Sequence, residues 1–408
     1  MRTQGRDGSV LQRHRSASLL GALNMGLSPA GRRRRAAFFA GTALAGGWLM
    51  LPLPATPDAP APADAAANPL AAFSDPARIW GAGVEAVIEA AYRRSFKTYI
   101  IGGKVMNLRM PFAENRERIA LSDREWEIEG RGKADPLSLW AEISGLLASA
   151  DFARYTAVLG DGQEKVVILD IPTRSWSVSR DLFDIARMKA GAYRGLPHRP
   201  YVLVSGRGIA ESDVYNYLSC VGRLGIDCSG FVWNILSHVA GAGGTDLGRA
   251  LRRAAKAPRN GNLSHYAGTQ FFNSRTREIL AVKDEVRNIR PADILLFRGE
   301  DGEAVHSAIV QSVNITRGVI RYLQSTDEAP LNERGAHESF IHFDPAHSET
   351  RLSDPALIWT QKRASPFPGE LAPPFADDGE RYRAYPESGG GRVVRLRAIA
   401  EAVKTLNP

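Results

Sequence analysis

The chain has 408 residues, of which 44% are hydrophobic and 24% charged; this leaves room for two domains and excludes a protein that is disordered throughout. The formal net charge is +8 at pH 7, but residues 1–35 hold eight arginines and one aspartate and therefore carry seven of these charges. The excess of positive charge thus lies in a basic leader, residues 1–35, and we expect no nucleic acid as a partner. A DNA-binding arm is the alternative, although no aromatic residue lies between the arginines.

An uncharged segment, residues 36–53, directly follows this basic leader. A basic stretch and then an apolar run is the arrangement of a secretory signal or of an uncleaved membrane anchor. The run is short for a membrane span and contains three glycines and one proline. We therefore expect export to the periplasm or cell envelope, with either cleavage of the leader or a membrane tether through residues 36–53. Met25 is an alternative start of the chain.

A Pro/Ala-rich linker, residues 54–70, leads into a first folded region, residues 71–185. The apolar pattern of this region predicts a mixed α/β structure, and no motif identifies its role. Three roles are consistent with this pattern: a substrate-positioning module, a wall-binding module, or an elaboration of the following domain. The pattern predicts helices over 76–92 and 138–148 and strands over 98–101, 105–109, 165–170 and 175–179.

The second region, residues 186–362, predicts an α+β domain, because a helix is followed by consecutive strands with short connections. A turn enters the helix over 225–239, whose apolar residues recur on one face. After a loop-like segment the pattern predicts an antiparallel sheet. Residues 363–408 are expected to be a Pro-rich tail. The pattern predicts further helices over 181–190 and 393–406 and strands over 293–297, 307–313 and 319–323.

Cys228 lies at the start of the predicted helix, where unpaired backbone amides and the helix dipole favour a thiolate. Asp227 is the expected N-cap, and Ser229 is small enough to leave the sulfur open to a substrate. The alternatives are an inert buried cysteine or a disulfide with Cys220, the only other cysteine of the chain. The position therefore predicts a nucleophile without excluding a structural role.

Two polar side chains further along the chain could complete a hydrolytic site. His306 opens a predicted apolar strand, so its imidazole could take the thiol proton and return it to a leaving amine. Gln324 ends the next predicted strand, and its amide oxygen could hold the imidazole in one orientation. A single histidine at a strand end is usually a solvated surface residue, so the prediction depends on the three residues together.

At these residues the sequence resembles the NlpC/P60 cysteine peptidases. Residues 226–232, Ile-Asp-Cys-Ser-Gly-Phe-Val, are similar to the nucleophile motif of that family. Residues 290–297 resemble its Pro-Gly-Asp strand, with Ala292 where glycine is usual, and residues 305–310 resemble the strand that carries the base. The resemblance implies a papain-like fold, a Cys228–His306–Gln324 site and peptidoglycan peptides as substrate, with neither metal nor cofactor.

The sequence departs from the family pattern in two places. The separation of 78 residues between Cys228 and His306 is long, so we expect residues 241–273 to form an inserted loop near the cleft. The usual Tyr/Trp-Gly-Gly stretch before the cysteine is not clear, and Tyr201 is a candidate for its oxyanion-binding residue. Four other histidines lack the spacing of a zinc site; they are His265, His337, His342 and His347.

The leading hypothesis is hydrolysis of an amide bond in peptidoglycan stem peptides through a thioester intermediate. A degenerate domain that binds wall peptides or a partner protein is the second hypothesis. An acyltransferase that uses the same residues is the third. The oligomeric state is not predicted.

Overall fold

The computed structural model places the described residues in the second of two compact units, residues 65–408. Among these residues, none of the helices combines the length and the apolar character needed to cross a membrane. The candidate signal or anchor, residues 36–53, lies outside the described part of the chain. The structure describes residues 83–113, 119–121, 124–126, 136–170, 174–179, 186, 201–204, 208–257, 263, 266–326, 334–361 and 378–406.

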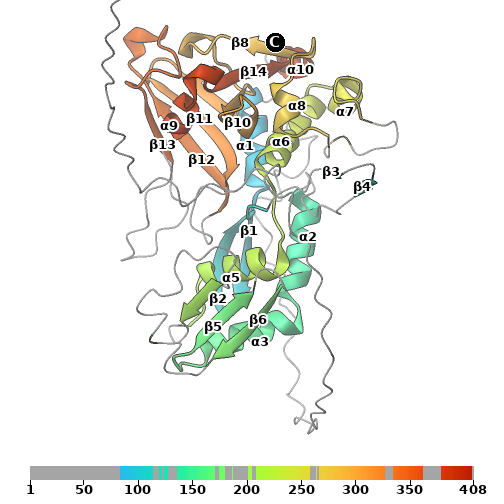
Figure 1. Cartoon of the computed structure of the whole chain (residues 1–408), viewed down its shortest axis with the longest axis vertical. Helices are drawn as coiled ribbons and strands as arrows, with labels where there is room; N and C mark the ends of the chain where they lie inside the picture. Colours follow the sequence, from blue (N-terminus) through green and yellow to red (C-terminus); the bar gives the residue numbers. More distant parts are fainter. Residues whose placement is uncertain are drawn as a thin grey trace, which may run out of the picture. The chain divides into compact units, whose positions relative to one another are not determined.

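A seven-stranded sheet is the largest element of the described chain, and all its pairings are antiparallel. The architecture is therefore α+β, and the predicted antiparallel sheet is confirmed (Figure 1). In spatial order the strands are β13 (Ile358–Gln361), β12 (Gly335–His342), β11 (Val319–Thr326), β10 (Ala304–Asn314), β9 (Ile294–Arg298), β14 (Arg392–Leu396) and β8 (Ile279–Val282).

The side chains of the central strands alternate between two buried faces of the sheet. Ile309 of β10 pairs with Leu323 of β11 and belongs to one apolar cluster. Val310 pairs with Tyr322 and belongs to the other cluster. These strands are buried on both faces, which is why they read as nearly continuous apolar runs in the sequence.

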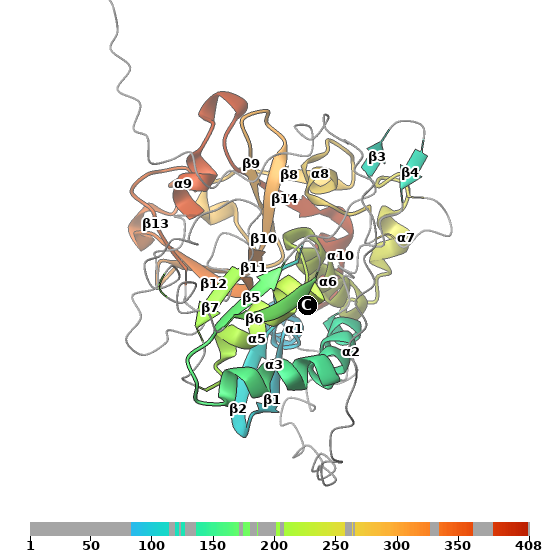
Figure 2. The ribbon, with the colours of Figure 1, turned by 60° about the horizontal axis from the view of Figure 1, so that its bottom comes forward.

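Helices α6 (Cys228–Ala242) and α1 (Val84–Arg93) pack against each other and against β10 on the first face. The predicted start of α6 is confirmed, and the residues on its apolar side are buried. Helix α10 (Arg397–Leu406) packs beside α6, as Figures 1 and 2 show. Helix α9 (Asp378–Arg383) contacts β9 and β13, and its Tyr382 belongs to the cluster on the second face.

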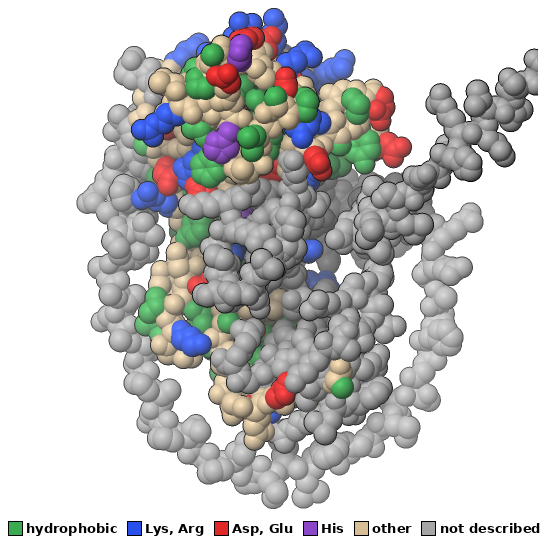
Figure 3. All heavy atoms as spheres, turned by 90° about the vertical axis from the view of Figure 1, so that its left-hand side faces the viewer, with side chains coloured by type: hydrophobic (Ala, Val, Ile, Leu, Met, Phe, Trp, Pro, Cys, Tyr) green, Lys and Arg blue, Asp and Glu red, His purple; other side chains and the backbone are tan. Residues whose placement is uncertain are grey.

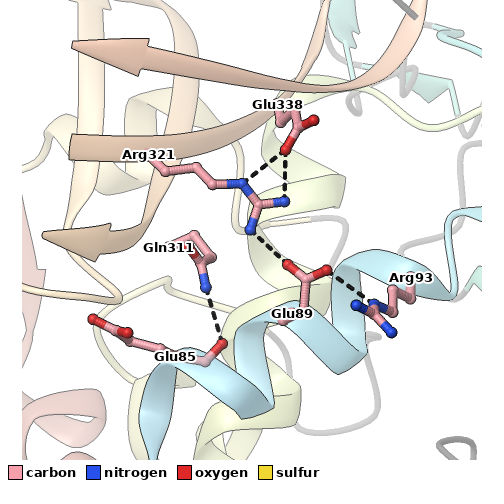
Figure 4. A network of polar contacts seen from close by, with 6 residues as sticks. All are labelled: Glu85, Glu89, Arg93, Gln311, Arg321 and Glu338. Carbon is pink, nitrogen blue, oxygen red and sulfur yellow. Dashed lines mark hydrogen bonds and ion pairs between the residues drawn. The ribbon is translucent and has the colours of Figure 1, made fainter. Parts of the chain in front are cut away.

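An ion-pair network fixes α1 to the sheet (Figure 4). Arg321 of β11 contacts Glu89 of α1 at 2.6 Å and Glu338 of β12 at 2.8 Å. Gln311 of β10 also donates to the carbonyl oxygen of Glu85. Burial raises the pKa of the Glu89 carboxyl, but the hydrogen bonds from Arg321 and Arg93 outweigh it and hold the pKa below its usual value. Helix α1 is thus bound to the same sheet that carries the candidate site.

The C-terminal segment corrects one sequence prediction. Residues 393–396, expected in a helix, belong to β14, and α10 begins only at Arg397. Strand β14 pairs with β9 on one side and β8 on the other. Val393 and Val394 are buried on opposite faces of the sheet, as a doubly covered strand requires. The expected tail therefore supplies an internal strand, because long-range pairing overrides the short local pattern.

A buried ion pair joins β14 to the start of β9. Arg395 contacts Asp293 through Nε at 2.6 Å and through Nη2 at 2.8 Å, and Asp293 is 0% exposed. The backbone amide of Arg290 also donates to the same carboxylate. Burial raises the pKa of Asp293, and Arg395 opposes this change. The preceding Ala292 has a φ of 71°, which explains why glycine suits this position of the motif.

Replacing Arg395 by methionine is expected to lower the free energy of unfolding by about 3 kcal/mol, because Asp293 is left buried without its partner. The deficit should be smaller at pH 4 than at pH 7. A carboxyl whose pKa is raised by folding keeps its proton in the native state, so its unfavourable contribution appears as pH rises. Urea unfolding of the R395M variant at both pH values tests this. The D293N/R395M double variant should recover most of the loss, and a deficit below about 1 kcal/mol would contradict the argument.

The first folded region contains the strand pairs that the sequence predicts. Strands β1 (Phe96–Ile101) and β2 (Lys104–Arg109) pair across Gly102 and Gly103, which both have positive φ. The predicted helix over 138–148 is α2, while 181–190 lies outside the described residues apart from residue 186. The other elements of the first region are β3 (Ile119–Leu121), β4 (Arg124–Trp126), α2 (Pro136–Leu147), α3 (Ala150–Gly160), β5 (Val166–Asp170) and β6 (Ser175–Ser179). Residues 201–222 of the second region add α5 (Glu211–Tyr217), the π-helical turn η4 (Leu218–Gly222) and β7 (Tyr201–Val204), which pairs with β5.

The segment over 241–273, expected to be an inserted loop, contains two short helices in its described part, α7 (Leu247–Leu251) and α8 (Thr269–Asn273). Helix α8 contacts β9 and β10, and Gln270 donates to the carbonyl oxygen of Ala304, the first residue of β10. Helix α8 of this segment therefore packs against the strand that carries His306. Three 3₁₀ turns complete the described elements: η6 (Val286–Asn288), η7 (Pro345–His347) and η8 (Pro386–Ser388).

Candidate active site

Cys228 is the first residue of α6, and its side chain is partly exposed. Cys220, in the preceding π-helical turn, is 0% exposed. Neither cysteine is in a disulfide, so the alternative of a bridge between them is not realised. The two cysteines therefore differ in access to solvent, and only Cys228 combines a helix N-terminus with an accessible sulfur.

The residues on either side of Cys228 shape the first turn of α6. The carboxylate of Asp227 accepts a hydrogen bond from the backbone amide of Gly230, so Asp227 is the predicted N-cap. Ser229 donates its hydroxyl proton to the same carboxylate at 3.1 Å. Ser229 is thereby turned back onto the cap.

His306 and Gln324 are brought together as the sequence predicts. The Nε2 atom of His306 lies 2.7 Å from Oε1 of Gln324, and the two side chains are 2% and 0% exposed. Because an amide oxygen only accepts hydrogen bonds, Nε2 carries the proton, and Nδ1 is the basic ring nitrogen. The ring also lies 5.2 Å from that of Phe297, which limits its movement. The histidine is therefore a buried, oriented imidazole and not a solvated surface residue.

Three residues around Gln324 were not anticipated. The Nε2 group of Gln324 donates to Asp378 at 2.7 Å and to the hydroxyl of Ser339 at 3.1 Å. The hydroxyl of Tyr322 donates to the same oxygen of Asp378 at 2.6 Å. Asp378 lies in the segment expected to be a tail, so no spacing in the sequence could connect it with His306. Its carboxylate raises the pKa of Tyr322, in addition to the larger effect of burial.

The start of α6 lies beside the end of β11, the strand that carries Gln324. Helix α6 contacts both β10 and β11, and the Ser325 hydroxyl donates to the carbonyl of Ile226 at 2.7 Å. The register places the His306 side chain on the face with Phe297, whereas the apolar side of α6 packs on the other face. A reaction that uses both Cys228 and His306 would require the two side chains to meet around the end of the sheet where β10 begins and β11 ends.

Tyr201, the candidate oxyanion residue, is the first residue of β7. It pairs with Leu169 of β5 in the separate three-stranded sheet β6-β5-β7. Its backbone position is thus outside the seven-stranded sheet, and its side chain is outside the described part of the structure. Its assignment to the site stays a prediction.

The two thiols are expected to react at very different rates. Burial raises the pKa of Cys220 to about 12, whereas Cys228 is accessible at a helix N-terminus. With a small alkylating reagent at pH 7, Cys228 should be modified at least about tenfold faster. Mass spectrometry of the peptides that contain each cysteine measures both rates. Equal, slow modification would contradict a reactive Cys228.

Within the part of the chain that the structure describes, the other histidines do not converge on a metal site. Among the described residues, no group of three or more His, Cys, Asp or Glu side chains is close enough to hold a metal ion. His337 is buried and accepts a hydrogen bond from Arg109, while its Nδ1 bonds the carbonyl of Gly335. Burial, followed by the charge of Arg109, lowers the pKa of His337 to about 3, so it is neutral. His265 lies outside the described residues.

Comparison with known proteins adds no further assignment: no family model, curated protein or solved structure matches the chain. The likeness to NlpC/P60 peptidases stays a prediction from residues 226–232, 290–297 and 305–310. On the face in Figure 3, acidic and basic side chains of the described residues are interspersed. That visible face carries charge of both signs, unlike the uniformly basic surface that binds nucleic acid.

Proposed function

We propose that the protein is a cysteine hydrolase that cleaves amide bonds in peptidoglycan stem peptides. The observation that carries the proposal is the bond of 2.7 Å between His306 Nε2 and Gln324 Oε1, at the end of the sheet where α6 begins with Cys228. A thiol, an imidazole and an orienting amide are the three components of nucleophilic acyl transfer by cysteine. The substrate class is supported by the motif likeness and by the export expected from residues 1–53.

In the proposed reaction, Nδ1 of His306 takes the thiol proton, and the Cys228 sulfur attacks the carbonyl carbon of the amide. The electron pair of the carbonyl π-bond moves onto oxygen, and backbone amides of the first turn of α6 stabilise this oxyanion. When the C–N bond breaks, His306 returns the proton to the departing nitrogen, which leaves a thioester on Cys228. A water molecule then loses a proton to His306 and attacks the thioester, which releases a carboxylic acid and the thiol.

The helix terminus supports this chemistry in two ways. The amides at the start of α6 and the helix dipole stabilise the thiolate before attack and the oxyanion afterwards. The Asp227 carboxylate is occupied by Gly230 and Ser229, so it acts as a cap and not as a competing base. The proton of the reaction is therefore assigned to His306, and Gln324 holds its ring.

Digestion of purified sacculi by the full-length protein tests the proposal. Hydrolysis should release soluble muropeptides and create one new amino group and one new carboxyl group per bond cut, which mass spectrometry and amine labelling measure. If the products carry an added amine in place of water, the reaction is acyl transfer and not hydrolysis. If the protein binds sacculi but releases no fragments, it is a degenerate domain that binds wall peptides and not a hydrolase.

A further inference from the structure

Helix α9 brings a buried carboxylate to the back of the candidate site. Asp378, the first residue of α9, is 1% exposed, and its Oδ2 accepts hydrogen bonds from Gln324 and Tyr322. The guanidinium of Arg381, one turn later, lies 3.6 Å from Oδ1. The carboxylate is thus buried, charge-compensated and aimed at the amide that orients His306.

We propose that Asp378 is a positioning residue that sets the direction of the Gln324 amide and, through it, the protonation of the His306 ring. This inference rests on the proposed function, because it assigns Asp378 a role in the same reaction. It makes the segment after residue 377 part of the site, where the sequence predicts only a tail.

The argument starts from the two ends of the Gln324 amide. An amide can turn by 180°, which exchanges its donor and acceptor ends, and the hydroxyl of Ser339 accepts either end because a hydroxyl both donates and accepts. An ionised carboxylate only accepts, so Asp378 binds the NH₂ end alone. The oxygen end of Gln324 is thereby left facing His306, which requires the proton on Nε2 and makes Nδ1 the base.

The same contact stabilises the charged form of His306. A carboxylate that accepts from one end of an amide polarises it and makes its oxygen a stronger acceptor. The Gln324 oxygen therefore binds an imidazolium more tightly than it binds a neutral imidazole. A more stable imidazolium favours transfer of the Cys228 proton to His306, so the thiolate forms at lower pH.

The charged and titratable groups around the network are consistent with this role. Tyr322 from β11 keeps its proton, because burial and then Asp378 raise its pKa, so it remains a donor to Asp378. Arg381 supplies a positive charge near Asp378, and its guanidinium also lies over the ring of Phe297 at 5.4 Å. Phe297 in turn contacts His306, so α9 supports the imidazole from two directions.

The test is the pH dependence of Cys228 alkylation in the full-length protein, which needs no peptidoglycan. In the D378A variant the midpoint of thiolate formation should rise by about one pH unit, so alkylation at pH 6 should slow by about tenfold. The D378N variant keeps a hydrogen-bond acceptor but loses the negative charge. Its midpoint should therefore lie between that of the unchanged protein and that of D378A. The E380Q variant removes a carboxylate from the exposed side of the same helix and should match the unchanged protein.

The outcomes separate this inference from the proposed function. A shifted profile in D378A and D378N, with unchanged thermal unfolding of D378N, supports the positioning role even if sacculi are not cleaved. Identical profiles in all four proteins would overturn it, including in a protein that cleaves sacculi. If D378A fails to fold, the D378N profile alone decides between the two results.

Discussion

Replacing Cys228 with alanine is expected to lower the rate of sacculus cleavage by about three orders of magnitude or more, because the covalent step has no nucleophile. The side chain is partly exposed and lies at the end of a helix, so its loss should change the free energy of unfolding by less than about 1 kcal/mol. Release of soluble muropeptides measures the rate, and thermal unfolding measures the fold.

Cys220 provides the matched control for this substitution. The C220A variant removes the same atom from a buried thiol that is not at the helix tip, so its activity per folded molecule should be unchanged. It should lose some stability, on the order of 1 kcal/mol, because a small cavity is left in the core. If the C228A variant retains cleavage, or if both variants lose it equally, Cys228 is not the nucleophile.

Replacing His306 with alanine is expected to lower cleavage by about two to four orders of magnitude, because the base that accepts and returns the proton is removed. Alkylation of Cys228 at pH 6 should also slow, since the thiolate loses its imidazolium partner. The Q324A variant should retain more activity than H306A, because it loosens the ring without removing it. Single-turnover release of fragments and the alkylation rate measure the two effects separately.

His342 offers a control on the same sheet. It lies in β12, is exposed, and is 3.3 Å from the hydroxyl of Thr360 at the surface. The H342A variant removes an equal side chain outside the network of His306 and should leave both rates unchanged. Cleavage by H306A at the rate of H342A would remove His306 from the mechanism, whatever the result for Cys228.

Local patterns in the sequence determined several elements directly. Asp227, directly before a run of residues with helical apolar spacing, marked the start of α6. The structure confirms it as the N-cap, because its carboxylate accepts a hydrogen bond from the backbone amide of Gly230. The apolar runs of β9, β10 and β11 were readable because strands covered on both faces are apolar at nearly every position. The pairing of His306 with Gln324 followed from their places at the adjoining ends of consecutive antiparallel strands.

Only the tertiary structure decided what joins these elements from a distance. Residues 393–396 read as the start of a helix, but they complete the sheet between β9 and β8, because backbone pairing with distant strands outweighs a weak local preference. Asp378 likewise has no local signature, and it becomes part of the network only because α9 packs against β9 and β13 and its carboxylate reaches Gln324. A hydrogen bond between residues more than fifty positions apart leaves no periodicity in the chain, which is why the contact of Asp378 with Gln324 could not be read from the sequence.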